Sequence, residues 1–276
     1  MNPSPFRRVE ISDPRFETDG LRQVTVKSEA LGGRGDVTVY VPPGVGAGRR
    51  PAPLVILLHG VYGSHWAWTG RAGAHRTAAR MAASGEIPPL VLAMPGDGLA
   101  GDGTGYLRHA RADYERWIIE DVPRAAALAA PAVDPGSPFC LGGLSMGGFG
   151  AMRLGARHGE RIRAVSGLSS VTALAQLRDF VAEDLGAAGV DVAGETVLEA
   201  WRRSGRRPAL RFDCGTGDPL LAGNRALHAG LLAAGIPHTY VEHPGGHTWE
   251  YWQEHLPETL RFFAECLRDG RGGPGG

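Results

Sequence analysis

The 276-residue sequence carries no net charge and contains no long hydrophobic run. Its 29 basic residues balance 29 acidic ones, so no excess charge is available to attract nucleic acid or an anionic membrane. No run of about 18 apolar residues is present, which argues against a membrane-spanning helix. No apolar segment follows Arg7 and Arg8 near the start, and we therefore expect no signal peptide. These absences predict a soluble, cytoplasmic protein with no nucleic-acid or membrane partner.

Lysine and cysteine are both scarce. Lys27 is the single lysine, which we interpret as genomic codon bias. The three cysteines, Cys140, Cys214 and Cys266, form an odd set without CxxC spacing, and the first two stand in apolar segments that suit small buried thiols. The pattern predicts no disulfide framework and no zinc or other metal site.

Alternation of apolar and polar residues predicts an antiparallel hairpin near the start of the chain, from strands at 21–30 and 36–41. The aliphatic run Leu54–Leu58 is typical of a central parallel strand covered on both faces. Strand-like and helix-like patterns then alternate about five times, which indicates a mostly parallel sheet with helices on both faces. We therefore predict an α/β fold with about eight strands.

The later strands are expected at 90–94, 139–144, 164–168, 210–215 and 239–242, and the helices at 72–84, 114–130, 146–158, 220–234 and 248–267. Pro123 should kink the second of these helices or start a new one.

One α/β domain is expected over residues 1–270. Residues 169–207 show helix-like patterns and no strand pattern, and they are too few to fold alone, so we interpret them as a cap-like helical excursion. The glycine-rich segment 98–105 is predicted to be a mobile surface loop, and residues 271–276 a disordered tail.

A serine flanked by glycines, Gly143-x-Ser145-x-Gly147, stands between an apolar run and a helix-like pattern. A strand that turns sharply into a helix holds its turn residue in a strained conformation with the side chain exposed. The glycines leave room for such a turn. By itself, the motif could also be a glycine-rich turn whose serine caps a helix.

Two later residues could act with Ser145, because sites in open α/β sheets lie at the carboxyl ends of the strands. Asp218 follows the strand predicted at 210–215, and His247 follows the one at 239–242. A histidine can take the serine proton, and a carboxylate can hold and stabilise the histidine. The order Ser145, Asp218, His247 is that of α/β-hydrolases, and we predict that these residues form a catalytic triad.

Each partner of the serine has an alternative. Asp218 could merely cap the following helix. Asp213 is a second candidate acid, but its position inside a strand favours a structural role. His243 is a second candidate base, at the strand end rather than in the glycine-containing loop beyond it. A metal pair of His243 and His247 is disfavoured, because Pro-Gly-Gly between them prevents a helical arrangement.

Two backbone amides are predicted to form an oxyanion hole. One belongs to Met146 after the serine, and the other to Val61 in the loop after the 54–58 strand. His59 in that loop is expected to shape it rather than to act as a base. The candidate pocket residues are aromatic: Tyr62, Trp66, Trp68, Tyr106 and Trp249.

As a set, His59-Gly60, Gly143–Gly148, Gly217-Asp218 and Gly245–Trp249 resemble the putative-esterase family of α/β-hydrolases. This family includes esterase D (S-formylglutathione hydrolase), feruloyl and acetylxylan esterases, enterochelin esterase and the antigen 85 mycolyltransferases. The resemblance extends from the first hairpin to the last helix. It implies an α/β-hydrolase fold, an oxyanion amide at Val61 and a catalytic histidine at His247.

The triad and the resemblance together predict a cofactor-independent serine carboxylesterase that hydrolyses short-chain or aryl esters through an acyl-enzyme. An acyltransferase or thioesterase of a biosynthetic pathway is the alternative, and a non-catalytic binding protein a more remote one. The lack of a signal peptide argues against secreted roles, and the lack of a cysteine near Val61 argues against formylglutathione as the substrate. The expected ligand is a small-molecule ester.

Overall fold

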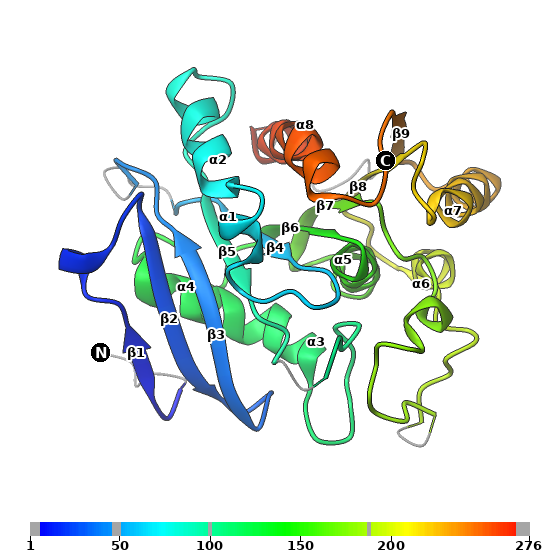
Figure 1. Ribbon diagram of the computed structural model, residues 1–276, viewed down its shortest axis with the longest axis horizontal. Coiled ribbons are helices and arrows are strands. Elements are labelled where there is room, and N and C mark those ends of the chain that lie inside the picture. The colour runs from blue at the N-terminus through cyan, green and yellow to red at the C-terminus, as the bar shows by residue number, and fades with distance from the viewer. Residues whose placement is uncertain (1–5, 46–50, 99–100, 187–188, 269–276) are drawn as a thin grey trace.

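The structure, a computed structural model, describes residues 6–45, 51–98, 101–186 and 189–268, and within these ranges nine strands form one sheet through the middle of the molecule (Figure 1). The strand order is β1-β2-β3-β5-β4-β6-β7-β8-β9. Strands β4 to β9 are parallel, whereas β1 and β3 run antiparallel to their neighbours. The prediction of a mostly parallel sheet is confirmed.

The strands are β1 (Val9–Ile11), β2 (Leu21–Ser28), β3 (Gly33–Tyr40), β4 (Leu54–Leu58), β5 (Val91–Pro95), β6 (Phe139–Leu144), β7 (Ile162–Leu168), β8 (Ala209–Gly215) and β9 (Thr239–His243). The α-helices are α1 (Ala67–Gly70), α2 (Ala74–Ala83), α3 (Tyr114–Arg116), α4 (Val122–Ala129), α5 (Met146–Arg157), α6 (Val197–Arg203), α7 (Leu221–Ala233) and α8 (Trp249–Arg268). Short 3-10 helices η1 (Pro14–Phe16) and η3 (Leu174–Leu177) and the π-helix η2 (Trp117–Asp121) complete the elements.

Strand β4 shows why the centre of the sheet is so apolar. All five of its residues are buried, and their side chains alternate between two hydrophobic clusters. Ile56 packs into the cluster shared with α4, α5 and α7, and Leu57 into the cluster shared with α2 and α8 (Figure 1). Each buried aliphatic side chain stabilises the fold by about 1.5–3 kcal/mol, and a strand covered on both faces therefore uses apolar residues at every position.

The opening hairpin differs from its prediction in two ways. Strand β3 already begins at Gly33, so that Gly35 pairs with Val26 inside the ladder instead of lying in the turn. The reason is local packing: a Cβ on Gly35 would stand 2.5 Å from the ring of Trp117, so glycine is needed within this strand. The three-residue strand β1, which pairs with β2, was not predicted at all.

The structure differs from the sequence predictions in the helix expected at 114–130 and in the excursion at 169–207. The predicted helix 114–130 consists of α3, the π-helix η2 and α4 in direct succession, and Pro123 is the second residue of α4, directly after the π-helical turn. Between β7 and β8, the described part of 169–207 contains only η3 and α6 as helices, so most of it is irregular rather than helical.

The predicted loop 98–105 lies partly outside the described residues, since 99 and 100 are not placed, and the predicted tail 271–276 lies wholly outside them. The described part of the loop contacts the excursion: Gly103 N–H donates to the carbonyl of Phe180 at 3.1 Å, and Gly103 forms an isolated bridge with Val181. Whether residues 169–207 act as a cap stays a prediction.

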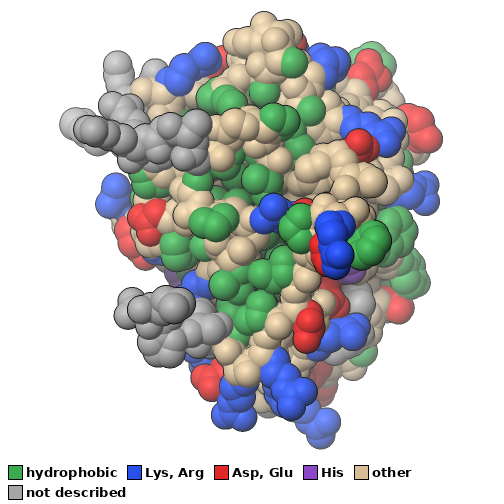
Figure 2. All heavy atoms as spheres, turned by 90° about the vertical axis from the view of Figure 1, so that its left-hand side faces the viewer, with side chains coloured by type: hydrophobic (Ala, Val, Ile, Leu, Met, Phe, Trp, Pro, Cys, Tyr) green, Lys and Arg blue, Asp and Glu red, His purple; other side chains and the backbone are tan. Residues whose placement is uncertain are grey.

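Strand β1 forms one edge of the sheet, and Figure 2 views the molecule from that side. Hydrophobic side chains lie exposed between charged ones on this face (Figure 2). Ile11 of β1 and Phe16 of η1 are exposed large hydrophobic residues. An edge strand of three residues offers few free backbone groups to another sheet.

Among the described helices, none is long and apolar enough to cross a bilayer.

A buried ion-pair cluster joins α3 to α5. Arg153 of α5 contacts Glu115 of α3 at 2.7 Å and also Glu195, and Glu115 further contacts Arg157 and His158. Burial raises the pKa of the Glu115 carboxyl, but His158 and the two arginines outweigh it and hold this pKa well below its usual value. Glu115 is therefore ionised throughout the neutral and mildly acidic range.

Glu115→Gln is expected to lower the free energy of unfolding at pH 7 by about 1–3 kcal/mol, because the buried Arg153 loses one of its two carboxylate partners and keeps Glu195 alone. The carboxylate stabilises the fold fully above its unfolded pKa of about 4.5 and progressively less as the pH falls towards the lower folded pKa. Urea denaturation between pH 7 and pH 3 should thus show a steeper loss of unfolding free energy in the wild type than in the variant.

Glu120→Gln is the control. It removes only the exposed pairs with Arg116 and Arg124 and should change the free energy of unfolding by less than about 0.5 kcal/mol. Parallel pH profiles of wild type and Glu115→Gln would contradict the prediction.

Candidate active site

Ser145 stands at the sharp turn between β6 and α5. Its backbone has φ 53° and ψ −118°, outside the conformations that side-chain-bearing residues normally adopt. The residue is 9% exposed, with its hydroxyl at the carboxyl end of the sheet. This is the strained strand-to-helix turn that the sequence motif predicts.

The two glycines of the motif are required by close backbone contacts. A Cβ on Gly143 would lie 2.2 Å from the carbonyl oxygen of Gly147, and a Cβ on Gly147 would lie 2.3 Å from the carbonyl oxygen of Leu58. Both distances are far shorter than any non-bonded contact, and backbone atoms cannot move aside as a flexible side chain can. The turn therefore holds Ser145 against β4 as well as against its own strand.

Gly143→Ala is expected to lower the free energy of unfolding by about 1–3 kcal/mol, the usual effect of overfilling a packed site, and to displace Ser145. Chemical denaturation would measure the loss. Gly205→Ala is a suitable control, because a Cβ there meets nothing within 4 Å, and it should change stability by less than about 0.5 kcal/mol. Equal stability of the two variants would contradict the close-contact argument.

His247 and Asp218 lie beside the serine in one continuous line. The His247 Nε2 atom is 3.1 Å from Ser145 Oγ, and its Nδ1 atom is 2.9 Å from Asp218 Oδ2. Asp218 follows β8, and His247 lies in the turn between β9 and α8. Sequence reasoning placed each of these residues just after a strand, and the parallel sheet brings them together at one edge.

The Asp218 carboxylate is held by more than the histidine. Its side chain is fully buried, and its second oxygen, Oδ1, accepts the Leu220 amide at 2.8 Å. Burial raises the pKa of this carboxyl, but the hydrogen bonds from His247 and from the Leu220 amide outweigh it, so that the pKa lies below its usual value. A carboxylate that stays ionised can fix the ring of His247 with Nε2 facing the serine.

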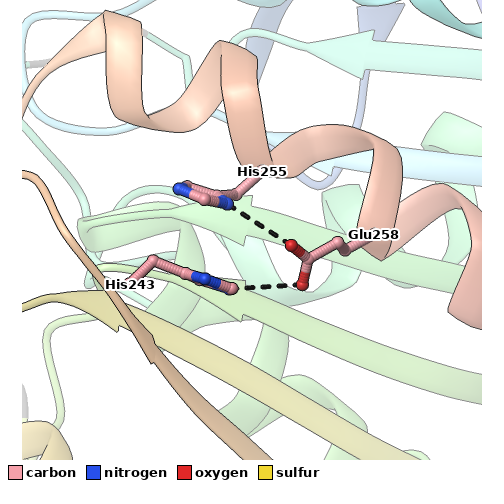
Figure 3. A group of neighbouring side chains, drawn as sticks. All are labelled: His243, His255 and Glu258. Atoms are coloured by element: carbon pink, nitrogen blue, oxygen red, sulfur yellow. Dashed lines mark hydrogen bonds and ion pairs between the residues drawn. The ribbon is translucent and has the colours of Figure 1, made fainter.

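The alternative residues of the sequence analysis have other partners. Asp213 is buried inside β8, where it pairs with Arg211 and accepts the hydroxyl hydrogen of Tyr251. His243 contacts Glu258 at 3.3 Å and stacks on His255 (Figure 3). Neither makes a hydrogen bond to Ser145 among the described residues, and the geometry therefore favours Asp218 and His247.

The cluster of His243, His255 and Glu258 does not suit a metal ion, although its potential ligand atoms lie within 4.8 Å of one another (Figure 3). The two rings are stacked at 4.0 Å with an interplanar angle of 11°, so the lone pairs of their nitrogens lie in nearly parallel planes and do not converge on one point. Glu258 also accepts a hydrogen bond from Arg211 at 2.6 Å, which neutralises it.

Two backbone amides around Ser145 have no hydrogen-bond acceptor among the described residues. The Ser145 amide is engaged with the Leu168 carbonyl at 3.0 Å, but the amides of Met146 and Val61 donate to no group of the described residues. Met146 is the first residue of α5, where the helix dipole favours negative charge. Gly60 brings the Val61 loop against the serine, since a Cβ on Gly60 would lie 3.2 Å from the Cβ of Ser145.

A cavity of about 480 Å³ opens beside Ser145 and His247. Three of the five predicted aromatic residues, Tyr62, Trp66 and Trp249, line it. The predictions for Trp68 and Tyr106 are corrected: both are fully buried and outside the cavity. Their polar atoms serve the backbone instead, because Trp68 Nε1 donates to the Leu58 carbonyl at 3.0 Å and the Tyr106 hydroxyl donates to the His59 carbonyl at 3.0 Å.

Sequence reasoning missed part of the cavity wall. The ring of Trp252 meets the ring of His247 edge-on, with 5.0 Å between the ring centroids, and Trp252 lines the cavity. Its position three residues after Trp249 on one helix was an available signal that both side chains lie on the same face. Phe180 and Leu177 come from the excursion between β7 and β8, for which no sequence pattern indicated an orientation. Arg71 also lines the cavity and lies over the ring of Trp249 at 5.5 Å.

The sheet order, the strained serine turn and the aspartate and histidine at strand ends together define the α/β-hydrolase fold. The chain belongs to the family described as "Putative esterase", whose model matches residues 28–263.

Similar proteins agree with this assignment. An acetyl esterase of Caldicellulosiruptor saccharolyticus is 28% identical over 143 residues, a match that covers 45% of this chain and 54% of that protein, so the chain spans about half the length of this curated relative. A solved ferulic acid esterase superposes with a TM-score of 0.77 at 24% identity and covers 95% of this chain and 99% of its own.

A second solved structure, the fluorophosphonate-binding serine hydrolase FphF of Staphylococcus aureus, has a TM-score of 0.73 at 19% identity, over 88% of this chain and 97% of its own. At these identities the two structural matches establish the fold alone.

Proposed function

We propose that the protein hydrolyses carboxylic esters through an acyl-enzyme formed on Ser145, with His247 as the general base and Asp218 as its orienting partner. The observation that carries this proposal is the unbroken line of contacts from Asp218 through His247 to Ser145 Oγ, at 2.9 and 3.1 Å. A serine hydroxyl is a weak nucleophile at neutral pH and needs such a base. The line ends in a cavity large enough for a small ester.

The reaction follows from these positions. Ser145 Oγ bonds to the ester carbonyl carbon while its proton passes to His247 Nε2, and the carbonyl oxygen becomes negatively charged between the amides of Val61 and Met146. The carbon–oxygen bond to the alcohol then breaks, and His247 returns the proton to the departing alcohol. Water attacks the acyl-enzyme in the same way, with His247 again taking and returning a proton, and releases the acid.

The walls of the cavity favour short-chain or aryl esters. Aromatic side chains of Tyr62, Trp66 and Trp249 line it together with Phe180 of the excursion. Flat rings offer apolar contact area and stacking to an acyl or alcohol group of similar shape. In this proposal, the excursion contributes to substrate choice through Phe180.

A panel of p-nitrophenyl esters of increasing acyl length, aryl methyl esters and a thioester tests this proposal. We expect the short-chain and aryl oxygen esters to turn over, and a fluorophosphonate to block the activity by labelling Ser145. A preference for the thioester, or partition of the acyl group to added alcohols in place of water, would favour the acyltransferase or thioesterase alternative. No turnover and no labelling would reject the proposal.

A further inference from the structure

We propose that His59 is a positioning residue for the oxyanion hole: its Nδ1–H holds the carbonyl of Gly60 and thereby turns the amide of Val61 towards Ser145. This inference rests on the proposed function and deepens it. His59 touches no substrate in this scheme, and its effect is transmitted through a single peptide group.

The first observation is the pair of hydrogen bonds on the Gly60 carbonyl oxygen. It accepts from His59 Nδ1 at 2.7 Å and from the Gly63 amide at 3.0 Å. The Gly60 carbonyl and the Val61 N–H belong to the same planar trans peptide, in which the two groups point in opposite directions. Whatever fixes the carbonyl therefore also fixes the direction of the Val61 amide.

The second observation is that His59 is itself immobilised. The residue is 2% exposed, and Gly63 packs so closely on its ring that a Cβ there would lie 2.5 Å from Nδ1. The carbonyl of His59 accepts the hydroxyl hydrogen of Tyr106, a fully buried residue, at 3.0 Å. A donor locked in this way can hold a peptide group in a glycine-containing loop that would otherwise have many accessible conformations.

The third observation concerns the tautomer of the ring. A carbonyl oxygen only accepts hydrogen bonds, so the hydrogen must be on Nδ1. Beyond the ring lies the buried carboxylate of Asp97, 3.7 Å from Nε2 and itself accepting the Thr104 hydroxyl at 3.1 Å. The ring thus uses its Nδ1 hydrogen for the oxyanion loop and is not the base for Ser145.

The side-chain geometry supplies a sharp experiment. The amide nitrogen of asparagine is attached to Cγ, as Nδ1 is in histidine, so His59→Asn can keep the hydrogen bond to Gly60. His59→Gln keeps a polar amide of similar size but places its nitrogen one bond further away, and His59→Leu removes the donor.

For p-nitrophenyl acetate, His59→Gln and His59→Leu should lower kcat about 100-fold, the effect of losing one oxyanion donor. KM should stay within about threefold, because the lost interaction acts on the transition state. His59→Asn should retain kcat within about fivefold of the wild type.

Binding of a trifluoromethyl ketone, whose adduct carries the oxyanion, provides a second readout. It should weaken in His59→Gln in the same proportion as kcat. Wild-type kcat in His59→Gln would overturn the inference, and so would equal losses in the Asn and Gln variants or a change confined to KM. Thermal melting identifies a variant that fails to fold, and the Asn and Gln pair then decides without the leucine variant. If the wild type itself shows no Ser145-dependent turnover, the proposed function has failed, which is a separate outcome.

Discussion

Replacing Ser145 with alanine is expected to abolish ester hydrolysis, with kcat for p-nitrophenyl acetate falling by about 10⁵–10⁶-fold. The variant keeps the cavity, the two amides and His247, but no oxygen remains to form the acyl-enzyme. Initial-rate assays at high enzyme concentration would measure the residual activity. Mass spectrometry after fluorophosphonate treatment should find an adduct on the Ser145 peptide of the wild type and none on that of the variant.

Two controls make this result specific. Alanine keeps the Cβ of Ser145 and hence the same backbone strain, so the free energy of unfolding should change by less than about 0.5 kcal/mol. Ser166→Ala removes another buried serine, whose hydroxyl contacts Thr259 at 2.8 Å in the core, and it should retain full activity. Turnover by Ser145→Ala close to that of the wild type would show that another group is the nucleophile.

His247→Ala is the second substitution with a large expected effect, a loss of about 10⁵-fold in kcat, since removing the base from such a triad costs about as much as removing the nucleophile. His243→Ala is the matched control. His243 is the last residue of β9 and stands four residues before His247, but its ring contacts Glu258 and His255. We expect it to change kcat by less than about threefold, although it can lower stability.

The two histidines are compared most directly through the ratio of kcat in His243→Ala to kcat in His247→Ala. Both variants should be assayed on one ester over a range of pH, together with added imidazole, which can enter the space left in His247→Ala and restore part of the rate. A larger loss in His243→Ala than in His247→Ala would transfer the base role to the strand end and contradict the geometry at Ser145.

The parts of the fold that follow from local patterns were predictable. Continuous aliphatic runs such as Leu54–Leu58 lie in the centre of the sheet, and the strand-helix alternation produced a mostly parallel sheet. The three residues proposed as the triad could be selected from the sequence because each follows a strand, and all parallel strands end at the same edge. The strand β1 has no such pattern, since three residues are too few to show a periodicity.

The walls of the cavity were less predictable, because the type of a residue does not determine which way it points. Trp66 is half-exposed in the cavity, whereas Trp68, two residues further, is buried on the Leu58 carbonyl. Tyr106 likewise supports His59 from the core. Phe180 reaches the cavity from an irregular segment whose path depends on tertiary contacts such as the one with Gly103.

The strained backbone of Ser145 sets the stability of the fold against the chemistry of the site. A residue with a side chain at φ 53° and ψ −118° destabilises the fold by about 1–3 kcal/mol, whereas glycine adopts such a conformation freely. Glycine would therefore relieve this strain, but it would also remove the hydroxyl that lies 3.1 Å from His247 Nε2. The serine thus stands where the backbone by itself prefers glycine, and what it adds there is a chemical group beside the cavity.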